Sequence, residues 1–353
     1  MNKRIFGADL LLLLTAAVWG FGFVAQRTGM QYIGPFTFNG IRFLLGSLSL
    51  LPLLAWKRSQ TRRTGIAARN AVSHVQDADT AAPAFSSFRT GAFYPSLLAG
   101  TCLFMGVTLQ QLGMMFTTAG NAGFITGLYV VLTPIFGIFL GRKTGPATWV
   151  GAILTLTGLY FLSSGGSSEG VNPGDIIVAV SAVFWAFHVL IIDRLVKKTD
   201  PLTLSSGQFA FAGLFALAAA FLVEPFLSHW LTTRGDLTGL IEWRSFPALI
   251  TGLKSGSIPV SFIANAMVPI LYGGLAAVGI GYTLQVVAQQ HAPPAHATII
   301  LCLEGCFAAL GGVIILGEQM SVWIIIGFSL MLAGMLASQW ELIAGGRDSV
   351  APD

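Results

Sequence analysis

Long apolar segments alternate with short polar connectors along almost the entire chain. A helix needs about 20 apolar residues to cross the roughly 30 Å of hydrocarbon in a bilayer. Because backbone polar groups in hydrocarbon must be paired within the segment, and because no segment alternates with the period of a strand, we expect an all-α membrane protein. The pattern predicts ten transmembrane helices, at residues 8–27, 35–56, 92–111, 118–140, 146–164, 174–195, 202–223, 267–289, 294–316 and 321–340.

The pattern of apolar segments and individual residues occurs twice. Residues 8–56 align with residues 174–222 at a constant spacing of 166 positions, which places Trp19 on Trp185. Further along, Thr108-Leu109-Gln110 matches Thr283-Leu284-Gln285, and Gly151 and Gly158 match Gly327 and Gly334. We therefore divide the chain into a first five-helix repeat, 1–164, and a second one, 165–353. Since five is odd, the second repeat must be inverted relative to the first, an architecture typical of secondary transporters.

The composition agrees with a lipid environment. Only 10% of the 353 residues are charged and 54% are hydrophobic, with a mean hydropathy of +0.75, whereas soluble domains are about 25% charged. The net charge of +4 does not indicate nucleic-acid binding, because most of the 19 lysines and arginines lie in the connectors on one side of the predicted spans. With a cytoplasmic N-terminus, only Arg234, Arg244 and Lys254 lie in external segments, and Arg27 and Arg42 lie in or beside spans. This bias predicts cytoplasmic N- and C-termini, a flexible cytoplasmic loop 57–91 and an external loop 224–266 at the membrane surface.

The sequence lacks the patterns of common catalytic and metal sites. The three cysteines lie in apolar segments without a CxxC or zinc spacing, and no HExxH or GxxxxGK motif occurs. His188 and Asp193 have the spacing of an acyltransferase pair, but five residues on a helix separate side chains by about 140°. We expect a protein that is not an enzyme and that uses neither a metal nor an organic cofactor.

Several short motifs together resemble one family. They are Trp19-Gly20, Arg42-Phe43-Leu44-Leu45, Asn121-Ala122-Gly123-Phe124-Ile125 with Leu132-Thr133-Pro134, Leu303-Glu304 and Leu316-Gly317-Glu318. In this order they resemble the drug/metabolite transporter superfamily, and among its members the EamA-type ten-helix transporters. The resemblance implies an inner-membrane carrier, often an exporter of amino acids or other small metabolites. The chain departs from the family at Gly305, where the family often has proline after Leu-Glu.

Glu304 is the most informative polar residue within a predicted span. It lies ten residues into the ninth span, so roughly 15 Å deep at 1.5 Å per residue. A charged acidic side chain at that depth costs about 2.5 kcal/mol or more, so it should face the protein interior or a wet cavity. The residue is a candidate for proton coupling or for binding a substrate ammonium group, and a structural hydrogen bond between helices is the alternative.

Other polar and aromatic residues within the spans form a wider set of candidates. Arg42 could bind a substrate carboxylate, pair with Glu304, or extend to the outer headgroups. Trp19 and Trp185 are equivalent mid-span residues that could wall an apolar site or simply pack. The remaining candidates for a polar path, or for hydrogen bonds between helices, are Gln110, Gln285, Asn121, His296 and Tyr129.

These observations favour a secondary transporter that moves a small metabolite by alternating access, with the lipid bilayer, a small-molecule substrate and protons as partners and no nucleic acid. A passive channel or scramblase is the alternative within the transport class. A structural or sensory membrane protein would not need the intramembrane Glu304 or the full-length inverted repeat.

Overall fold

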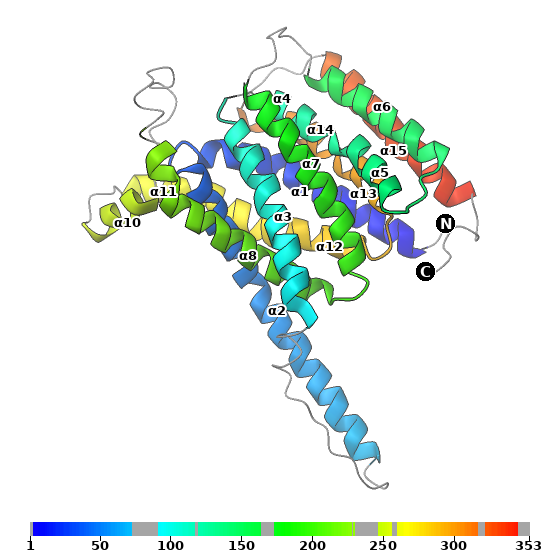
Figure 1. Cartoon of the computed structure of the whole chain (residues 1–353), viewed down its shortest axis with the longest axis horizontal. Coiled ribbons are helices and arrows are strands. Elements are labelled where there is room, and N and C mark those ends of the chain that lie inside the picture. Colours follow the sequence, from blue (N-terminus) through cyan, green and yellow to red (C-terminus); the bar gives the residue numbers. More distant parts are fainter. Residues whose placement is uncertain are drawn as a thin grey trace.

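The computed structural model describes residues 3–72, 91–116, 119–163, 173–227, 229, 246–255, 260–316 and 322–344, and every regular element in these ranges is a helix (Figure 1). The first repeat consists of α1 (Lys3–Gly29), α2 (Pro35–Val72), α3 (Phe93–Gly113), α4 (Ala119–Thr126), α5 (Tyr129–Phe139) and α6 (Pro146–Ser163). The second consists of α7 (Pro173–Leu195), α8 (Pro201–Leu222), α10 (Phe246–Lys254), α11 (Val260–Leu271), the π-helix η2 (Tyr272–Tyr282), α12 (Thr283–Ala288), α13 (Pro294–Leu301), α14 (Glu304–Leu316) and α15 (Val322–Ala344).

The helices coincide with the ten predicted spans. Seven helical stretches within the described ranges are long and apolar enough to cross a membrane, and three shorter apolar helices occupy the remaining predicted positions, at Tyr129–Phe139, Pro146–Phe161 and Ile325–Ser338. The prediction of an all-α membrane protein with two five-helix repeats is confirmed. The chain is a multi-pass membrane protein.

The packing of α2 against α8 shows that the repeats are inverted. These helices are equivalent by sequence, yet they run antiparallel. Near the start of α2, the backbone N–H and the hydroxyl of Thr37 donate to Glu224, which follows the end of α8, at 2.7 and 2.6 Å. At the opposite end, Lys57 of α2 forms an ion pair with Asp200, the residue that caps the start of α8. Both ends of the helix pair are therefore fastened by a carboxylate.

The capping carboxyl group of Asp200 lies at the surface. It also accepts hydrogen bonds from the backbone and side chain of Thr203, at 3.1 and 2.9 Å. Partial burial alone would raise the pKa of this carboxyl, but the hydrogen bonds from Lys57 and Thr203 outweigh burial, and the pKa lies below its ordinary value. Asp200 therefore caps α8 as a carboxylate at neutral pH.

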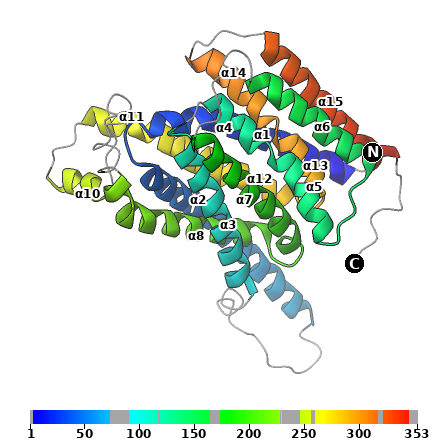
Figure 2. The same ribbon diagram turned by 45° about the horizontal axis from the view of Figure 1, so that its top comes forward.

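The last helix of each repeat packs against the other, and α6 and α15 lie side by side in both views (Figures 1 and 2). A Cβ atom on Gly151 would lie 2.7 Å from the carbonyl oxygen of Gly334, and one on Gly158 would lie 2.6 Å from that of Gly327. Only glycine permits this approach. The symmetry that relates the repeats converts one contact into the other, because Gly151 is equivalent to Gly327 and Gly158 to Gly334. The crossing is thus symmetric about the axis that relates the repeats.

The fourth and ninth spans are interrupted at equivalent positions, where we expected continuous helices. Gly127 and Leu128 separate α4 from α5, and Cys302 and Leu303 separate α13 from α14. At each interruption the amide donates to the carbonyl three residues back, as from Leu128 to Ile125 and from Leu303 to Ile300, both at 3.1 Å. The two interruptions meet, since the thiol of Cys302 lies 3.7 Å from the carbonyl oxygen of Gly127. Tight turns within matching spans commonly surround the binding site of inverted-repeat transporters.

Two predicted loops contain helix. α2 continues through Val72, so residues 57–72 form a helical extension that projects from the bundle (Figures 1 and 2), while residues 73–90 lie outside the described residues. Lysine, arginine, glutamine and alanine favour helix here, and the ion pair of Lys57 holds the point where the extension begins. The loop 224–266 contains α10 and the start of α11, and its residues 228, 230–245 and 256–259 are not described.

A π-helix forms in the middle of the eighth span. The glycine-rich segment η2 packs on α1, and side chains of each element bind the backbone of the other. The indole of Trp19 donates to the carbonyl of Ala277 at 3.0 Å, and Thr15 donates to that of Gly281 at 3.2 Å. In return, the Tyr272 hydroxyl donates to the carbonyl of Val18 at 2.9 Å. π-Helical segments are rare and frequently lie at functional sites.

Candidate functional site

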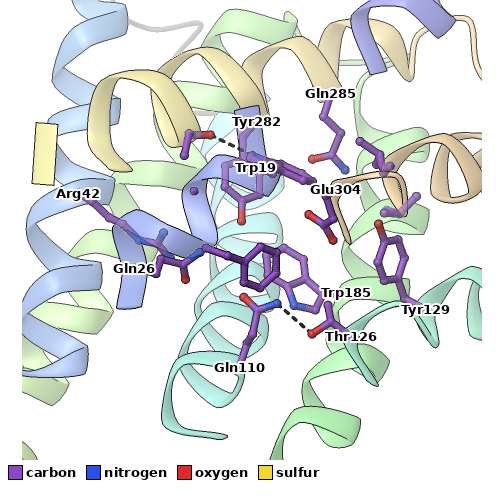
Figure 3. Close-up of a pocket in the computed structure, with 15 residues that line it drawn as sticks. Trp19, Gln26, Arg42, Gln110, Thr126, Tyr129, Trp185, Tyr282, Gln285 and Glu304 are labelled. Atoms are coloured by element: carbon purple, nitrogen blue, oxygen red, sulfur yellow. Dashed lines mark hydrogen bonds between the residues drawn. The ribbon is translucent and has the colours of Figure 1, made fainter. Parts of the chain in front are cut away.

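A cavity lies between the two repeats (Figure 3). Helices of both repeats line it. They include α1 and its equivalent α7, and the residues around the interruption between α13 and α14. Its lining residues are Trp19, Gly22, Phe23, Gln26, Arg42, Gln110, Thr126, Tyr129, Trp185, Val189, Ala277, Tyr282, Gln285, Leu301 and Glu304. Aromatic and apolar side chains with several polar groups among them are typical of the lining of small-molecule binding sites.

Three aromatic rings form the middle of the cavity wall. The Trp19 ring lies 4.4 Å from Tyr282 and 6.5 Å from Trp185 between centroids, and Trp185 and Tyr282 are nearly parallel at 6.1 Å. Trp19 packs over Gly281 and Trp185 over Gly106, so the two tryptophans use equivalent glycines of equivalent helices. The wall offers a large apolar surface in the middle of the protein.

Arg42 forms one end of the cavity and is 3% exposed. Its Nε donates to the side-chain oxygen of Asn39 at 2.9 Å, and its guanidinium lies 5.3 and 5.1 Å from the ring centroids of Phe38 and Phe43. These contacts leave the two terminal nitrogens of the guanidinium for other partners. Arg42 does not extend to the headgroups, because α2 and η2 enclose it: the nearest side-chain atom to a Cβ on Gly273 would be Arg42 Cδ, at 3.3 Å.

Glu304 lies toward the opposite end of the cavity, near Tyr129 (Figure 3). It is 9% exposed and is the first residue of α14, directly after the interruption of the ninth span. The positive end of a helix dipole favours an acidic side chain at this position. The turn at Cys302 and Leu303 thus places a carboxylate at the start of a half-helix in the protein interior.

The cation and the carboxylate of the cavity do not neutralise each other. Figure 3 shows Arg42 and Glu304 on opposite sides of the aromatic wall. Among the described residues, ion pairs join Lys57 to Asp200 and both Arg142 and Lys197 to Asp193, and no ion pair includes Arg42 or Glu304. The predicted alternative of a pair between Arg42 and Glu304 is not formed in this structure.

Several polar atoms of the lining are buried without a hydrogen-bond partner. They are the side-chain oxygens of Gln26 and Gln285, the hydroxyl of Tyr129 and the indole nitrogen of Trp185. Each unpaired buried group costs about 1–3 kcal/mol. A polar molecule in the cavity could satisfy all of them. Gln110 differs, because its amide donates to the hydroxyl of Thr126 at 3.0 Å.

Seven of the nine predicted site residues line this cavity: Glu304, Arg42, Trp19, Trp185, Gln110, Gln285 and Tyr129. His296 does not line it. Its ring nitrogens bind Asp9 at 2.9 Å and Ser338 at 3.0 Å, which ties α13 to α1 and α15. The side chain of Asn121 lies outside the described residues.

Three polar residues of the lining, Gln26, Thr126 and Tyr282, were not among the predicted candidates. Two of them could have been found by comparing equivalent positions of the two repeats. Gln26 is equivalent to Ile192, and Tyr282 is equivalent to Val107, so each is a polar residue where the other repeat has an apolar one.

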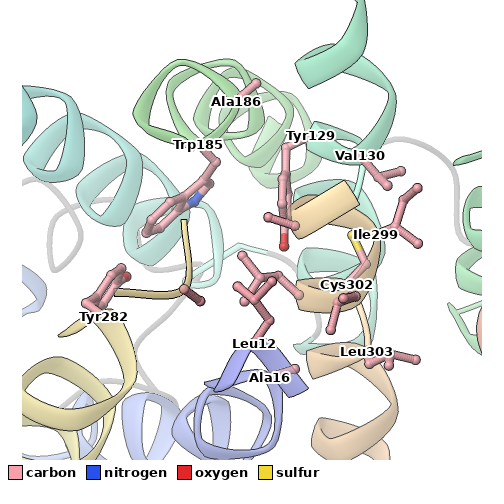
Figure 4. Close-up of a cluster of buried hydrophobic side chains, with 14 of the residues drawn as sticks. Leu12, Ala16, Tyr129, Val130, Trp185, Ala186, Tyr282, Ile299, Cys302 and Leu303 are labelled. Atoms are coloured by element: carbon pink, nitrogen blue, oxygen red, sulfur yellow. The ribbon is translucent and has the colours of Figure 1, made fainter. Parts of the chain in front are cut away.

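An apolar core surrounds the cavity (Figure 4). Leu12 and Ala16 of α1, Val130 of α5, and Ile299 and Leu303 at the interrupted ninth span are at most 1% exposed. Tyr129, Trp185 and Tyr282 belong both to this core and to the cavity lining. The half-helices are therefore held by close packing. Among the described residues, no group of three or more His, Cys, Asp or Glu side chains could hold a metal ion.

Comparisons with known proteins agree with this architecture. The model of the EamA-like transporter family matches residues 6–164 and 172–338, which correspond to the two repeats. A transporter of Archaeoglobus fulgidus is 29% identical over 95% of this chain and 87% of its own length. The inner membrane transporter YedA of Escherichia coli K12 is 24% identical over 99% of this chain and 95% of its own length.

A mammalian protein and a solved structure are also similar to this chain. Solute carrier family 35 member F6 of the mouse is 24% identical over 68% of this chain and 65% of its own length. One crystal structure superposes with a TM-score of 0.67 at 17% identity, covering 96% of this chain and 99% of that one, which shows the fold alone. The family model, matched once by each repeat, establishes that the chain belongs to the EamA-like transporter family.

Proposed function

We propose that this protein is a secondary carrier for a small metabolite that bears both a carboxylate and an ammonium group, such as an amino acid, and that it works by alternating access in the inner membrane. The observation that carries the proposal is the arrangement of Arg42 and Glu304, a buried guanidinium and a buried carboxyl group at opposite ends of one cavity, neither in an ion pair.

Unpaired buried charges are costly, and a charged side chain in a membrane interior marks a functional site by default. A dipolar substrate would offset both costs at once. Its carboxylate can accept two parallel hydrogen bonds from the terminal nitrogens of Arg42, and its ammonium group can donate to Glu304. The aromatic wall of Trp19, Trp185 and Tyr282 would contact the apolar part of such a molecule.

The inverted repeats and the interrupted fourth and ninth spans support movement by alternating access, because such carriers move one repeat against the other around a central site. When no substrate is bound, a proton on Glu304 would remove its charge. We therefore propose proton exchange for substrate at Glu304, with both termini in the cytoplasm and export as the physiological direction, which is a common role in this family.

Counterflow in proteoliposomes tests the proposal. Vesicles loaded with an unlabelled amino acid should accumulate the labelled compound transiently, with saturation, for at least one member of a panel of the 20 protein amino acids. The matching amine and the matching carboxylic acid, each with only one of the two charges, should compete about tenfold or more weakly. A passive channel or scramblase would show no saturation and no counterflow, and equal competition by the amine would contradict the role of Arg42.

Two variants separate coupling from binding. Glu304→Gln should abolish uptake driven by a pH gradient, because the neutral amide cannot exchange a proton. Counterflow should persist with a higher half-saturation concentration, because the amide oxygen still accepts a hydrogen bond from the ammonium group, more weakly than a carboxylate. Arg42→Gln introduces the residue that the second repeat has at the equivalent position, Gln208. It should weaken binding in both assays. Equal loss of both activities in Glu304→Gln would contradict proton coupling at this residue.

A further inference from the structure

A second buried polar cluster lies directly behind the aromatic wall of the cavity. His188 on α7 and Gln208 on α8 are fully buried, and His188 Nε2 lies 2.9 Å from Gln208 Oε1. The His188 ring stands edge-on to Trp185 and to Tyr282, with centroids 6.1 and 6.4 Å apart and interplanar angles of 89°. Since both rings line the cavity, one layer of side chains separates His188 from it.

This cluster has unused hydrogen-bonding capacity. His188 Nδ1, Gln208 Nε2 and Trp185 Nε1 are buried without a partner. When Gln208 accepts through Oε1, His188 Nε2 is a donor and Nδ1 is an acceptor. The three unpaired atoms therefore comprise two donors and one acceptor. A molecule with a carboxylate and an ammonium group has the complementary set.

The repeat relates this cluster to the existing cavity. His188 is equivalent to Gly22 and Gln208 to Arg42, and both Gly22 and Arg42 line the cavity. Arg42 lies near the connector 29–35, which we name the α1–α2 end. Gln208 lies near the connector 195–201, the α7–α8 end, which faces the opposite side of the membrane because the repeats are inverted.

From this geometry we infer that His188, Gln208 and Trp185 form a second substrate subsite, which lines the cavity when the carrier opens toward the α7–α8 end. The inference rests on the proposed function, since it assigns a site in the other transport state. An inverted-repeat carrier changes state by moving one repeat against the other, so the opposite state exposes the equivalents of the residues that line the cavity now.

The two subsites differ in charge. Arg42 offers a permanent cation to a carboxylate, whereas Gln208 Nε2 and Trp185 Nε1 offer neutral donors. Hydrogen bonds to a charged donor are roughly twice as strong as those between neutral groups. The substrate is therefore held more weakly at the α7–α8 end than at the α1–α2 end.

The α7–α8 end is closed in this structure. Asp193, five residues beyond His188 on α7, forms an ion pair with Arg142, which follows α5. Arg194 donates to the carbonyl of Leu140, the last residue before the turn at Gly141, at 3.2 Å. These contacts hold α5 and α7 together beyond the cluster, so opening must separate them.

Cysteine labelling tests whether the cluster becomes accessible. In a background without the native cysteines, His188→Cys and Gln208→Cys should react with a charged, membrane-impermeant maleimide added from one side only. That side is defined by the exposed reference Arg194→Cys. Gln111→Cys is the matched control, because Gln111 is fully buried with both polar atoms unpaired and does not line the cavity. The native residues to be replaced are Cys102, Cys302 and Cys306.

Both cluster positions should label faster than position 111 from the side of Arg194→Cys. Labelling no faster than position 111, or labelling from the opposite side, would overturn the inference. This readout needs no known substrate, so it stands even if no amino acid shows counterflow and the proposed function fails.

Transport kinetics provide the second test, with whichever amino acid of the panel shows counterflow in the native protein. Gln208→Leu should raise the half-saturation concentration about tenfold when the labelled amino acid is added at the α7–α8 end, and leave it unchanged at the α1–α2 end. An equal change at both ends, or none, would contradict a subsite that belongs to one state.

Discussion

The two equivalent tryptophans should respond in opposite ways to the same substitution. Trp19→Phe removes the indole nitrogen that donates to the Ala277 carbonyl at 3.0 Å, whereas Trp185→Phe removes an indole nitrogen that has no partner. Both substitutions delete the same atoms, so the difference between them isolates one hydrogen bond.

The magnitude follows from that bond. A hydrogen bond contributes about 0.5–1.5 kcal/mol, and a buried carbonyl left without its donor adds to the loss. We expect Trp19→Phe to be less stable than Trp185→Phe by about 1–2 kcal/mol, which corresponds to a few degrees in the midpoint of thermal unfolding. In transport, Trp185→Phe should be the more impaired variant, with the higher half-saturation concentration, because the indole nitrogen of Trp185 is free to donate to the substrate.

Thermal unfolding of the purified variants in one detergent measures their relative stability. Counterflow measures their half-saturation concentrations. Trp185→Phe should have the higher midpoint and the higher half-saturation concentration. If Trp185→Phe unfolds at the same temperature as Trp19→Phe, the indole bond to η2 does not stabilise the protein, and the role of the π-helix as its acceptor is wrong.

The remaining predictions concern packing and charge outside the cavity. Glu224→Ala should lower stability by about 2–4 kcal/mol, because it removes the fully buried carboxylate that accepts two hydrogen bonds from Thr37 in the first turn of α2, and the unfolding midpoint in detergent measures this loss. Gly158→Ala should cost about 1–3 kcal/mol through the 2.6 Å approach of its new Cβ to the Gly327 carbonyl oxygen, also measured by thermal unfolding; an unchanged midpoint would mean that α6 and α15 separate easily. Asp193→Arg should lower the yield of folded protein or its counterflow, because it places two cations together where the ion pair with Arg142 stood. The double variant Asp193→Arg/Arg142→Asp should recover part of that loss, and a double variant as impaired as the sum of the two single variants would show that the pair does not act as a unit.

The positions of the spans could be predicted from the sequence because the bilayer imposes one length and one polarity on every helix. The inversion followed from the odd number of spans per repeat, and the antiparallel packing of α2 and α8 agrees with it. The cavity lining was largely predictable as well, since a polar residue deep in an apolar span must face the interior.

The interruptions at Gly127 and Cys302 could not be predicted, because no proline lies at either position and an apolar run reads the same whether its hydrogen bonds span three or four residues. The burial of Arg42 was equally hidden. Its flexible side chain can reach either the headgroups or the interior, and only the contact with Asn39 and two phenylalanine rings selects the interior. The extension of α2 beyond Trp56 follows helix propensity, which the search for apolar spans does not consider.

The glycine crossing of α6 and α15 also bears on how such a chain can be assembled from halves. Its two contacts, between Gly151 and Gly334 and between Gly158 and Gly327, are exchanged by the axis that relates the repeats. An interface of this kind is isologous, the type found between two identical subunits. Two copies of one five-helix polypeptide, inserted in opposite orientations, would meet through the same surface. The connector between α6 and α7 is therefore not needed to create the contact. It ensures that each molecule contains one copy of each repeat and that the two repeats have opposite orientations.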